Sequence, residues 1–367
     1  MPICYLAFPG NFALPGNFIL AALLTGCFRL PESTYGWIIS LPFWCNGLQL
    51  LFMPLLARRY SAKAIAATGA LLQLLAWVGL WIALPWLPRD PQAFTAAFFF
   101  VFFLVSSQLG AFCSVAWSAW VREWVPERIR GQYFGLRNRL LQLSLVVFFL
   151  GVAAVMGGRG DTVRAFQIVV GFAVLTRAAS VTLLFRTPAG RSTSMESQRT
   201  PWRAQLGHVW RARPLWWFML FGAGWGLAAN TFGPFYPIFM YRQLGLSAAQ
   251  VSLLVILNTL ASAIAFPAWG RLLDRFGNKP VMAAALLLWQ LPYYLWCFLT
   301  PANAWLLYPF WLWSGFISAG FILGQFNLLL KLLPAEAQST AIGCNLAITA
   351  LVAALAPIIG GELISWA

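Results

Sequence analysis

The chain has 367 residues, of which 61% are hydrophobic and 9% are charged. Soluble domains are about 45–50% apolar and about 25% charged, so this composition excludes a water-soluble fold and indicates a protein solvated by a bilayer. The formal net charge is +15. Because the basic residues lie in short segments between apolar stretches, we expect the lipid bilayer, and no nucleic acid, as a partner.

Eleven apolar segments are long enough to cross a membrane as helices, which takes about 20 residues. A transmembrane barrel would instead show alternating segments of about 10 residues. The first segment is interrupted by Pro9 and Pro15, and it lacks the basic start and cleavage site of a signal peptide. The expected spans are residues 3–28, 35–57, 63–87, 93–120, 133–156, 163–185, 214–240, 249–272, 279–299, 303–331 and 338–365.

The connection at residues 186–213 is rich in Arg, Ser, Thr and Pro and separates two groups of spans. It predicts an N-terminal bundle at 1–185 with six spans and a C-terminal bundle at 214–367 with five. Residues 202–210 place tryptophan and aliphatic side chains on one helical face, which predicts a helix lying under the membrane. An ordinary linker remains the alternative for this segment.

Most of the 24 lysines and arginines lie in the even-numbered connections between spans. The excess of positive charge in cytoplasmic loops therefore places these connections and the N-terminus in the cytoplasm. We expect an integral protein of a bacterial inner membrane. Arg177 lies inside the sixth span, and we expect its side chain to extend toward the cytoplasmic side.

The two groups of spans resemble each other. Proline and glycine enclose eight residues in both PERIRGQYFG at 126–135 and PAEAQSTAIG at 334–343, and RYSAK at 59–63 corresponds to RFGNK at 275–279. This pattern predicts a parallel repeat about an axis along the membrane normal, giving two pseudo-symmetric six-helix bundles. The counterpart of the sixth span would fall beyond Ala367, so we expect the twelfth span to be missing and its groove to be open.

The segment GRLLDRFGNKP at 270–280 is similar to the G-x-L-x-D-R-x-G-x-[RK] signature of the major facilitator superfamily of transporters. The residues that carry the similarity, and that we assign to a cytoplasmic gate, are Gly270, Asp274, Arg275, Gly277 and Lys279. The P-x-x-x-R-G run at 126–131 is similar to that family's loop between spans four and five. The first-half copy of the signature departs from the pattern, because Pro54 and Arg58 replace its glycine and its acid.

The resemblance implies a two-bundle transporter that exposes its substrate site to each side in turn. In the family, the signature acid meets the start of a helix in the opposite half while the cytoplasmic side is closed. Here it implies that Asp274 approaches Gly131, with Arg130 and Arg137 nearby, and that the contact acts as a latch of ~1–3 kcal/mol. The alternative for this segment is a solvated loop that only fixes topology.

In the family, spans one, four, seven and ten line the central path. The resemblance therefore points to polar residues near the middle of these spans, since a buried amide costs free energy unless it is paired or faces water. The expected substrate-binding residues are Gln108, Asn230, Gln325, Trp225 and Asn17. The alternative for each amide is a hydrogen bond between helices.

The chain shows no acidic pair, phosphate loop or nucleophile elbow, and His208 is its single histidine. We therefore expect no catalytic residue, no metal and no cofactor, and a protein that is not an enzyme. No acidic residue falls in the middle of a span, which favours a neutral or anionic solute and facilitated or weakly coupled transport. We expect a monomer that moves a small polar solute. The alternatives are a membrane-embedded enzyme and a non-transporting scaffold or sensor.

Overall fold

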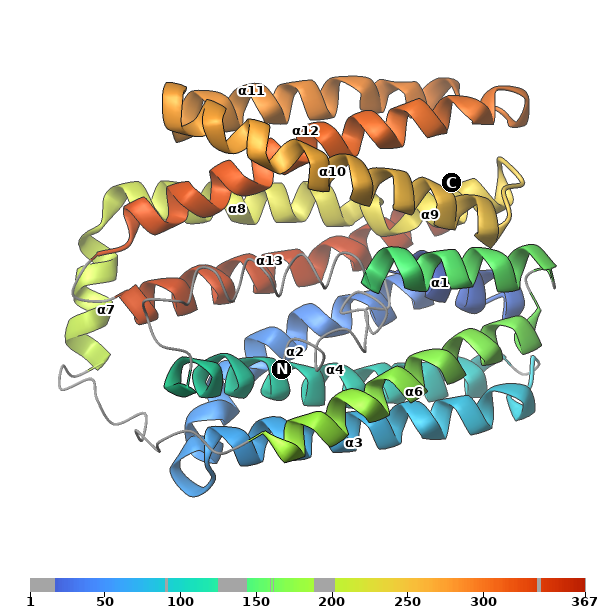
Figure 1. Ribbon diagram of the computed structural model, residues 1–367, viewed down its shortest axis with the longest axis horizontal. Helices are drawn as coiled ribbons and strands as arrows, with labels where there is room; N and C mark the ends of the chain where they lie inside the picture. The colour runs from blue at the N-terminus through green and yellow to red at the C-terminus, as the bar shows by residue number, and fades with distance from the viewer. Residues whose placement is uncertain are drawn as a thin grey trace.

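The computed structural model describes residues 17–89, 92–124, 144–158, 160, 162–187, 202–334 and 338–366. In these residues every regular element is a helix, which confirms the expected all-helical fold. Figure 1 shows the long helices running roughly side by side, with the two halves of the chain stacked one above the other.

The N-terminal half contains the elements up to residue 187. They are α1 (Phe18–Ala21), η2 (Ala22–Cys27), α2 (Glu32–Arg59), α3 (Ala62–Ala83), η3 (Leu84–Trp86), α4 (Gln92–Trp124), the helix Ser144–Gly158, and α6 (Val163–Arg186). Ser61 accepts a hydrogen bond from the Ala64 amide and so caps α3. α3 packs between α4 and α6, and α2 packs on the other side of α4.

The C-terminal half begins with a helix that lies across the ends of the others. Its elements are α7 (Trp202–Arg211), α8 (Arg213–Phe232), η4 (Gly233–Phe235), α9 (Tyr236–Arg242), α10 (Ala248–Phe276), α11 (Asn278–Gln290), η5 (Leu291–Phe298), η6 (Pro301–Leu306), α12 (Leu307–Leu332) and α13 (Gln338–Trp366). The expected span 214–240 is thus broken at η4, where Pro234 and Pro237 remove backbone donors.

Seven helical segments of the described chain are long and apolar enough to cross a membrane. They correspond to six expected spans between residues 63 and 331 and to the last one, at 338–365. α2, α8 and the shorter helices at 18–27 and 144–158 lie where the other four were expected.

α10 and α12 pack with their backbones in close contact. Gly315 of α12 leaves no room for a side chain against the backbone of Asn258, and Gly320 lies against the ring of Trp269. Ser262 donates a hydrogen bond to the carbonyl of Gly315 (2.8 Å), which ties the two helices together. α10 then ends at Phe276, and the φ of 85° at the following Gly277 favours glycine in the turn to α11.

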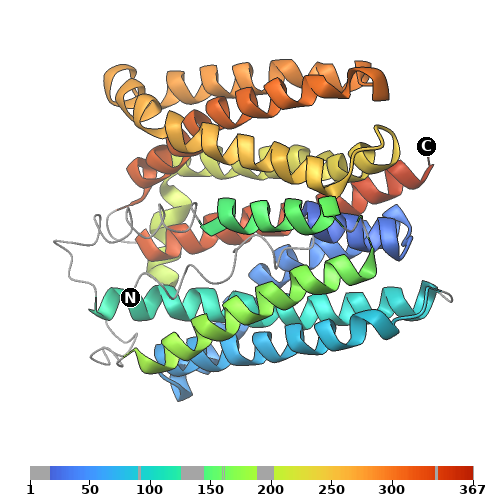
Figure 2. The ribbon, with the colours of Figure 1, turned by 45° about the vertical axis from the view of Figure 1, so that its right-hand side comes forward.

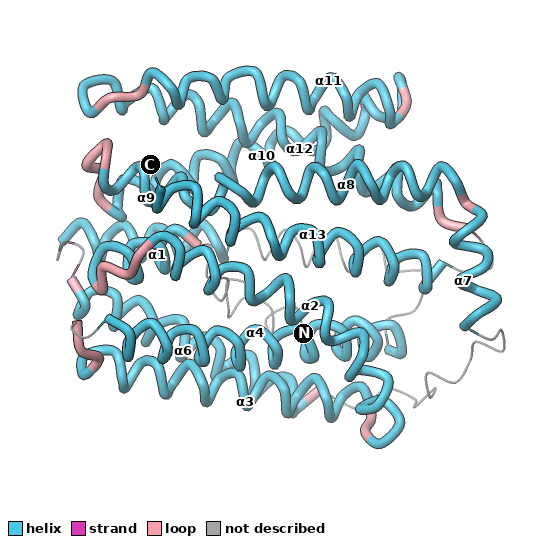
Figure 3. The backbone as a smooth tube through the Cα atoms, turned by 180° about the vertical axis from the view of Figure 1, so that it is seen from behind, coloured by secondary structure: helices cyan, strands magenta, loops and turns pink. Residues whose placement is uncertain are grey.

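The two halves meet along α2 and α13. At one end of these helices, a side chain at Gly36 would overlap the Pro357 carbonyl, and one at Gly361 would overlap the Glu32 carbonyl. Figures 1 and 3 show α2 and α13 side by side at this end and spreading apart toward the other end, where α7 lies crosswise. We call the first end the α9 end and the second the α7 end.

α7 contacts the C-terminal half through Val209. Val209 is buried together with Leu215, Met219 and Ala341, whereas Trp210 is 73% exposed. Figure 1 shows α7 at the ends of the long helices, and Figure 2 shows the two stacked halves in a second view. Residues 202–211 thus form a helix rather than an extended linker, and its location at a membrane surface stays a prediction.

Candidate functional site

One face of α2 changes from buried to exposed along the helix. Tyr35 in the first turn is fully buried, whereas Asn46 is exposed. Their separation of eleven residues is about three turns, so both side chains lie on one face, about 16 Å apart along the axis. Trp37 and Leu55 each lie nine residues from Asn46, which is about two and a half helical turns, so they lie on the opposite face of α2. Both are exposed apolar side chains. The exposed amide thus faces away from the lipid side of α2.

The neighbours of Asn46 show that it lies at the boundary between the halves. On one side, the Cys45 thiol donates to the Leu104 carbonyl of α4, at 3.7 Å. On the other side, Gly47 faces the side chain of Leu351 in α13. Asn46 comes between these two faces and is exposed, which indicates an opening between the halves at the middle of α2.

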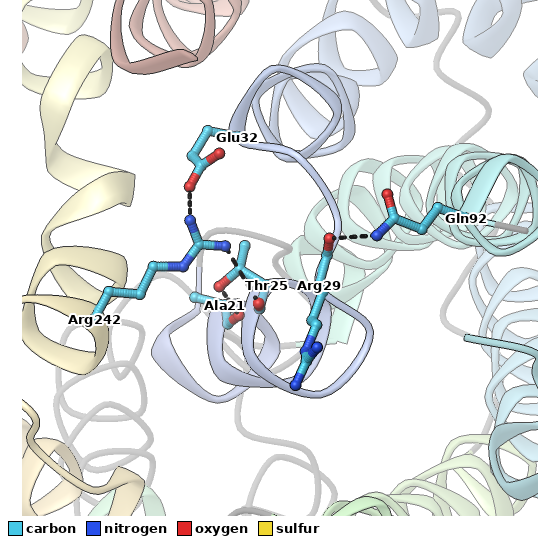
Figure 4. Close-up of polar contacts among 6 residues, drawn as sticks. All are labelled: Ala21, Thr25, Arg29, Glu32, Gln92 and Arg242. Atoms are coloured by element: carbon cyan, nitrogen blue, oxygen red, sulfur yellow. Dashed lines mark hydrogen bonds and ion pairs between the residues drawn. The ribbon is translucent and has the colours of Figure 1, made fainter. Parts of the chain in front are cut away.

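At the α9 end, an ion pair joins the halves (Figure 4). The Arg242 guanidinium at the end of α9 pairs with the Glu32 carboxylate at the start of α2. A second nitrogen of Arg242 donates to the Thr25 carbonyl at 3.4 Å, and the Thr25 hydroxyl donates to the Ala21 carbonyl at 2.8 Å. Arg242 is 44% exposed and Glu32 is 17% exposed, so the carboxylate is largely withdrawn from water. We call this arrangement the Arg242 clasp.

Two tyrosines support the clasp from opposite halves. The Tyr35 hydroxyl donates to the Pro234 carbonyl at 3.3 Å, and its ring meets the Phe235 ring edge-on at 5.6 Å between centroids. The Tyr241 hydroxyl donates to the Phe18 carbonyl at 2.9 Å. The α9 end is therefore closed by contacts that run in both directions between the halves.

The α7 end carries the sequence motif that was assigned to the cytoplasmic gate. Asp274, Arg275 and Lys279 are all exposed, and within the described residues Asp274 has no ion pair. Its expected neighbours, Arg130, Gly131 and Arg137, lie outside the described residues. The halves are thus in contact at the α9 end, whereas α2 and α13 diverge toward the α7 end.

Gly270, the first residue of the motif, lies in α10. A side chain added at Gly270 would meet no atom within 4 Å in the described part of the chain.

Four of the expected substrate-binding residues occupy different surroundings. The Asn230 amide donates to the Gly226 carbonyl of its own helix at 2.8 Å. Trp225 packs against Trp289 and Phe321, at 5.5 and 5.1 Å between centroids. Gln325 is half-buried, and the buried amide nitrogen of Gln108 has no hydrogen-bond partner among the described residues. Within that part of the chain, no hydrogen bond links any two of these four.

Asn17, the fifth expected residue, has a structural role in this state. Its side-chain oxygen accepts a hydrogen bond from the Ile19 amide at 2.9 Å and caps α1, and it is 9% exposed. Asparagine often caps a helix in this way. An asparagine in an apolar segment can therefore serve either as a cap or as a ligand-binding residue, and the sequence alone does not distinguish the two roles.

Arg177 is engaged inside the N-terminal half rather than extending freely toward the α7 end. Its guanidinium donates to the Gln73 side-chain oxygen at 2.6 Å, and the Gln73 nitrogen donates to the Ser106 carbonyl at 3.2 Å. The Gln73 amide fits beside Gly110, where a larger residue would meet it at 2.8 Å. Gln73 thus couples α6 to α4 at the turn that carries Gln108.

Asn46 and Gln49 were not among the expected substrate-binding residues, which came only from spans one, four, seven and ten. Gln49 is 8% exposed, and its side-chain oxygen is buried with no partner in the described residues. The signal was present as two amides in the middle of an apolar segment, since such groups are costly in a membrane unless they are used.

A family model described as the Major Facilitator Superfamily matches residues 3–231 and 225–367. The structure is similar to a variant of the nucleoside transporter NupG, with a TM-score of 0.75 at 15% identity, covering 100% of this chain and 91% of that one. It is also similar to a bacterial homologue of the human lysosomal transporter Spinster in an inward-facing and unoccupied conformation (TM-score 0.72, 17% identity, 99% and 81% covered). A third similar structure is the xylose transporter XylE from E. coli in a partially occluded inward-open conformation (TM-score 0.64, 14% identity, 99% and 95% covered). No curated protein matched the chain.

Proposed function

Because the chain belongs to the Major Facilitator Superfamily, it is an integral membrane transporter that works by alternating access, and we propose that its cargo is a small polar solute. The solved relatives carry different cargoes, so the shared fold leaves the solute to be argued from this chain. The observation that carries the proposal is the single face of α2 that is sealed at Tyr35 and open at Asn46. An opening with a polar side chain at mid-helix suits a solute that needs hydrogen bonds inside the membrane.

We infer that the α7 end faces the cytoplasm, as the basic connections at that end indicate. The state described here is then open to the cytoplasm and closed outside by the Arg242 clasp. The N-terminus would lie in the cytoplasm, and the positive loops suit the inner membrane of a bacterium. We infer that the chain works as a monomer, binds no nucleic acid and catalyses no chemical reaction.

In the opposite state, we propose that the α7 end closes and that Asp274 then meets the start of the fifth span near Gly131. Asp274 is exposed and has no ion pair among the described residues, which supports a contact that forms only in the opposite state. Arg130 and Arg137 would supply nearby positive charge. Gly277 gives the turn into α11, while Arg275 and Lys279 mainly fix the topology.

For the substrate path we retain Gln108 as the strongest residue, because its amide nitrogen is buried without a partner in the described chain. Asn230, Gln325 and Trp225 are second to it, since two of them already have partners within the C-terminal half.

The test is a thermal-shift screen of the purified protein, followed by uptake into proteoliposomes. Solutes that raise the melting temperature would be supplied outside vesicles that hold the protein and outside protein-free vesicles. We expect saturable uptake of at least one small polar solute only in the vesicles that hold the protein. Strong binding with no uptake in either direction would favour a sensor, and chemical conversion of a solute would favour a membrane enzyme.

A further inference from the structure

Gln49 of α2 and Gln108 of α4 lie at one depth on neighbouring helices. The contact between the Cys45 thiol and the Leu104 carbonyl fixes the register of the two helices. α2 and α4 run in the same direction, because α3, which connects them in the chain, runs the opposite way. Gln49 and Gln108 each come four residues after the contact, which is about one turn. The two glutamines therefore lie at the same depth on neighbouring helices.

The hydrogen-bonding groups of this set are unsatisfied in a complementary way. The buried oxygen of Gln49 lacks a donor, and the buried nitrogen of Gln108 lacks an acceptor, within the described part of the chain. The Ser107 hydroxyl is also buried without a partner there. Buried polar atoms without a hydrogen-bond partner are rare, because each one loses the free energy of its hydration and gains no hydrogen bond in return. An acceptor and two donors left open together suit a ligand that supplies the matching groups.

Asn46 connects this set to the opening between the halves. The Gln49 nitrogen lies 3.4 Å from the Asn46 oxygen, which is a long hydrogen bond, and Asn46 itself is exposed. Gln49 lies about one turn nearer the open α7 end than Asn46, but only Asn46 is exposed at the opening, so a solute would contact Asn46 at the surface and Gln49 beside it. Arg177, which reaches the α4 side of this set through Gln73, is engaged by the Gln73 side-chain oxygen.

We propose that Asn46 and Gln49 of α2 bind the substrate together with Gln108, and that the substrate is an uncharged, hydroxyl-rich solute. This inference rests on the proposed transport function. A hydroxyl both donates and accepts, so adjacent hydroxyls can meet the Gln49 oxygen and the Gln108 nitrogen at once. A charged solute would need an opposite charge in this low-dielectric place, and Asn46, Gln49, Ser107 and Gln108 offer none.

The experiment uses the full chain in detergent and in proteoliposomes with two panels of probes. One panel holds D-xylose, D-glucose, uridine and glycerol, and the other holds charged amino acids, organic anions and organic cations. The variants are Asn46→Ala and Gln49→Ala, with Gln167→Ala as the matched control. Gln167 is a glutamine of α6 that donates to the Trp81 carbonyl, away from the set.

We expect a neutral probe to bind, and both α2 variants to weaken its binding at least tenfold while the control stays within twofold. Deoxy analogues of the bound probe then separate contact from packing. Removing the hydroxyl that meets Gln49 should weaken binding to the wild type but have much less effect on Gln49→Ala. Melting temperatures measured without solute show whether each variant is folded.

Three results would overturn the inference. In the first, every deoxy analogue loses the same factor in wild type and Gln49→Ala, so Gln49 only joins helices. In the second, a charged probe is transported and no neutral probe binds. This result refutes an uncharged, hydroxyl-rich substrate but leaves the transport function in place. In the third, neither panel binds or is taken up, which removes the proposed small polar cargo as well. If Gln49→Ala does not fold, the same comparison is made with Asn46→Ala, whose exposed side chain is tolerant of truncation.

Discussion

Replacing Arg242 with Gln should open the α9 end. The substitution removes the charge that pairs with Glu32 and leaves a side chain that still donates a hydrogen bond. Exposed ion pairs contribute about 0.2–1 kcal/mol, and this pair lies at the upper end because Glu32 is only 17% exposed. Because the pair exists only while the α9 end is closed, a loss of about 1 kcal/mol should raise the population open at that end about fivefold.

Spin labels on opposite halves would measure this population. Arg164 at the start of α6 and Gln243 after α9 are both exposed at the α9 end, and each would be replaced by cysteine. Double electron–electron resonance spectroscopy measures the distance between the two labels. It should show a second, longer distance, and the fraction of molecules at that distance should increase in Arg242→Gln. Arg89→Gln is the matched control, since it removes an exposed positive charge from the N-terminal half alone.

A charge-swapped variant sharpens the test. Glu32→Arg combined with Arg242→Glu should restore the closed distance, whereas either reversal alone should open the α9 end further than Arg242→Gln. An unchanged distance distribution in Arg242→Gln, or an equal shift in Arg89→Gln, would refute the assignment of the clasp as a state-dependent contact.

Three other substitutions test separate parts of the structure. Gly36→Ala places a methyl group against the Pro357 carbonyl, so it should lower stability by ~1–3 kcal/mol or separate α2 from α13 in the same distance measurement; a full-stability variant with unchanged distances would contradict the close contact. Gly110→Ala should be less stable than Gly79→Ala by about 1 kcal/mol in thermal unfolding, because only the first displaces the Gln73 amide; equal stabilities would mean that this amide moves without cost. Asp274→Asn should raise the accessibility of the α7 end to water-soluble thiol reagents and reduce transport; normal values of both would leave Asp274 as a topology signal.

The all-helical architecture could be predicted from composition because lipid leaves few solutions for satisfying the backbone. Gly277 could be predicted because a short charged turn between two apolar segments demands a residue that tolerates positive φ. The break in the span at η4 was also within reach, since Pro234 and Pro237 stand in the sequence as plainly as the apolar residues around them.

The Arg242 clasp could not be predicted in this way. Glu32 and Arg242 are separated by 210 residues, and each belongs to a connection that looks like an isolated loop charge. The ion pair between them depends on how the two halves pack together, and the residues near each of them in the sequence do not determine that packing. The partner of Arg177 was missed for a related reason, because the side chain chosen by a buried cation depends on the rotation of α3 about its axis.

The position of the glycine contact between α2 and α13 determines how the molecule can act as a lever. Gly36 lies near one end of α2, and the helix continues for 23 residues to Arg59. With this contact as the fulcrum, a rotation of ~10° moves the far end of α2 by ~6 Å over an arm of ~35 Å, which is about the width of a small solute. The same rotation hardly displaces the α9 end. Opening that end therefore requires the fulcrum to travel along α2, toward the place where Gly47 meets Leu351.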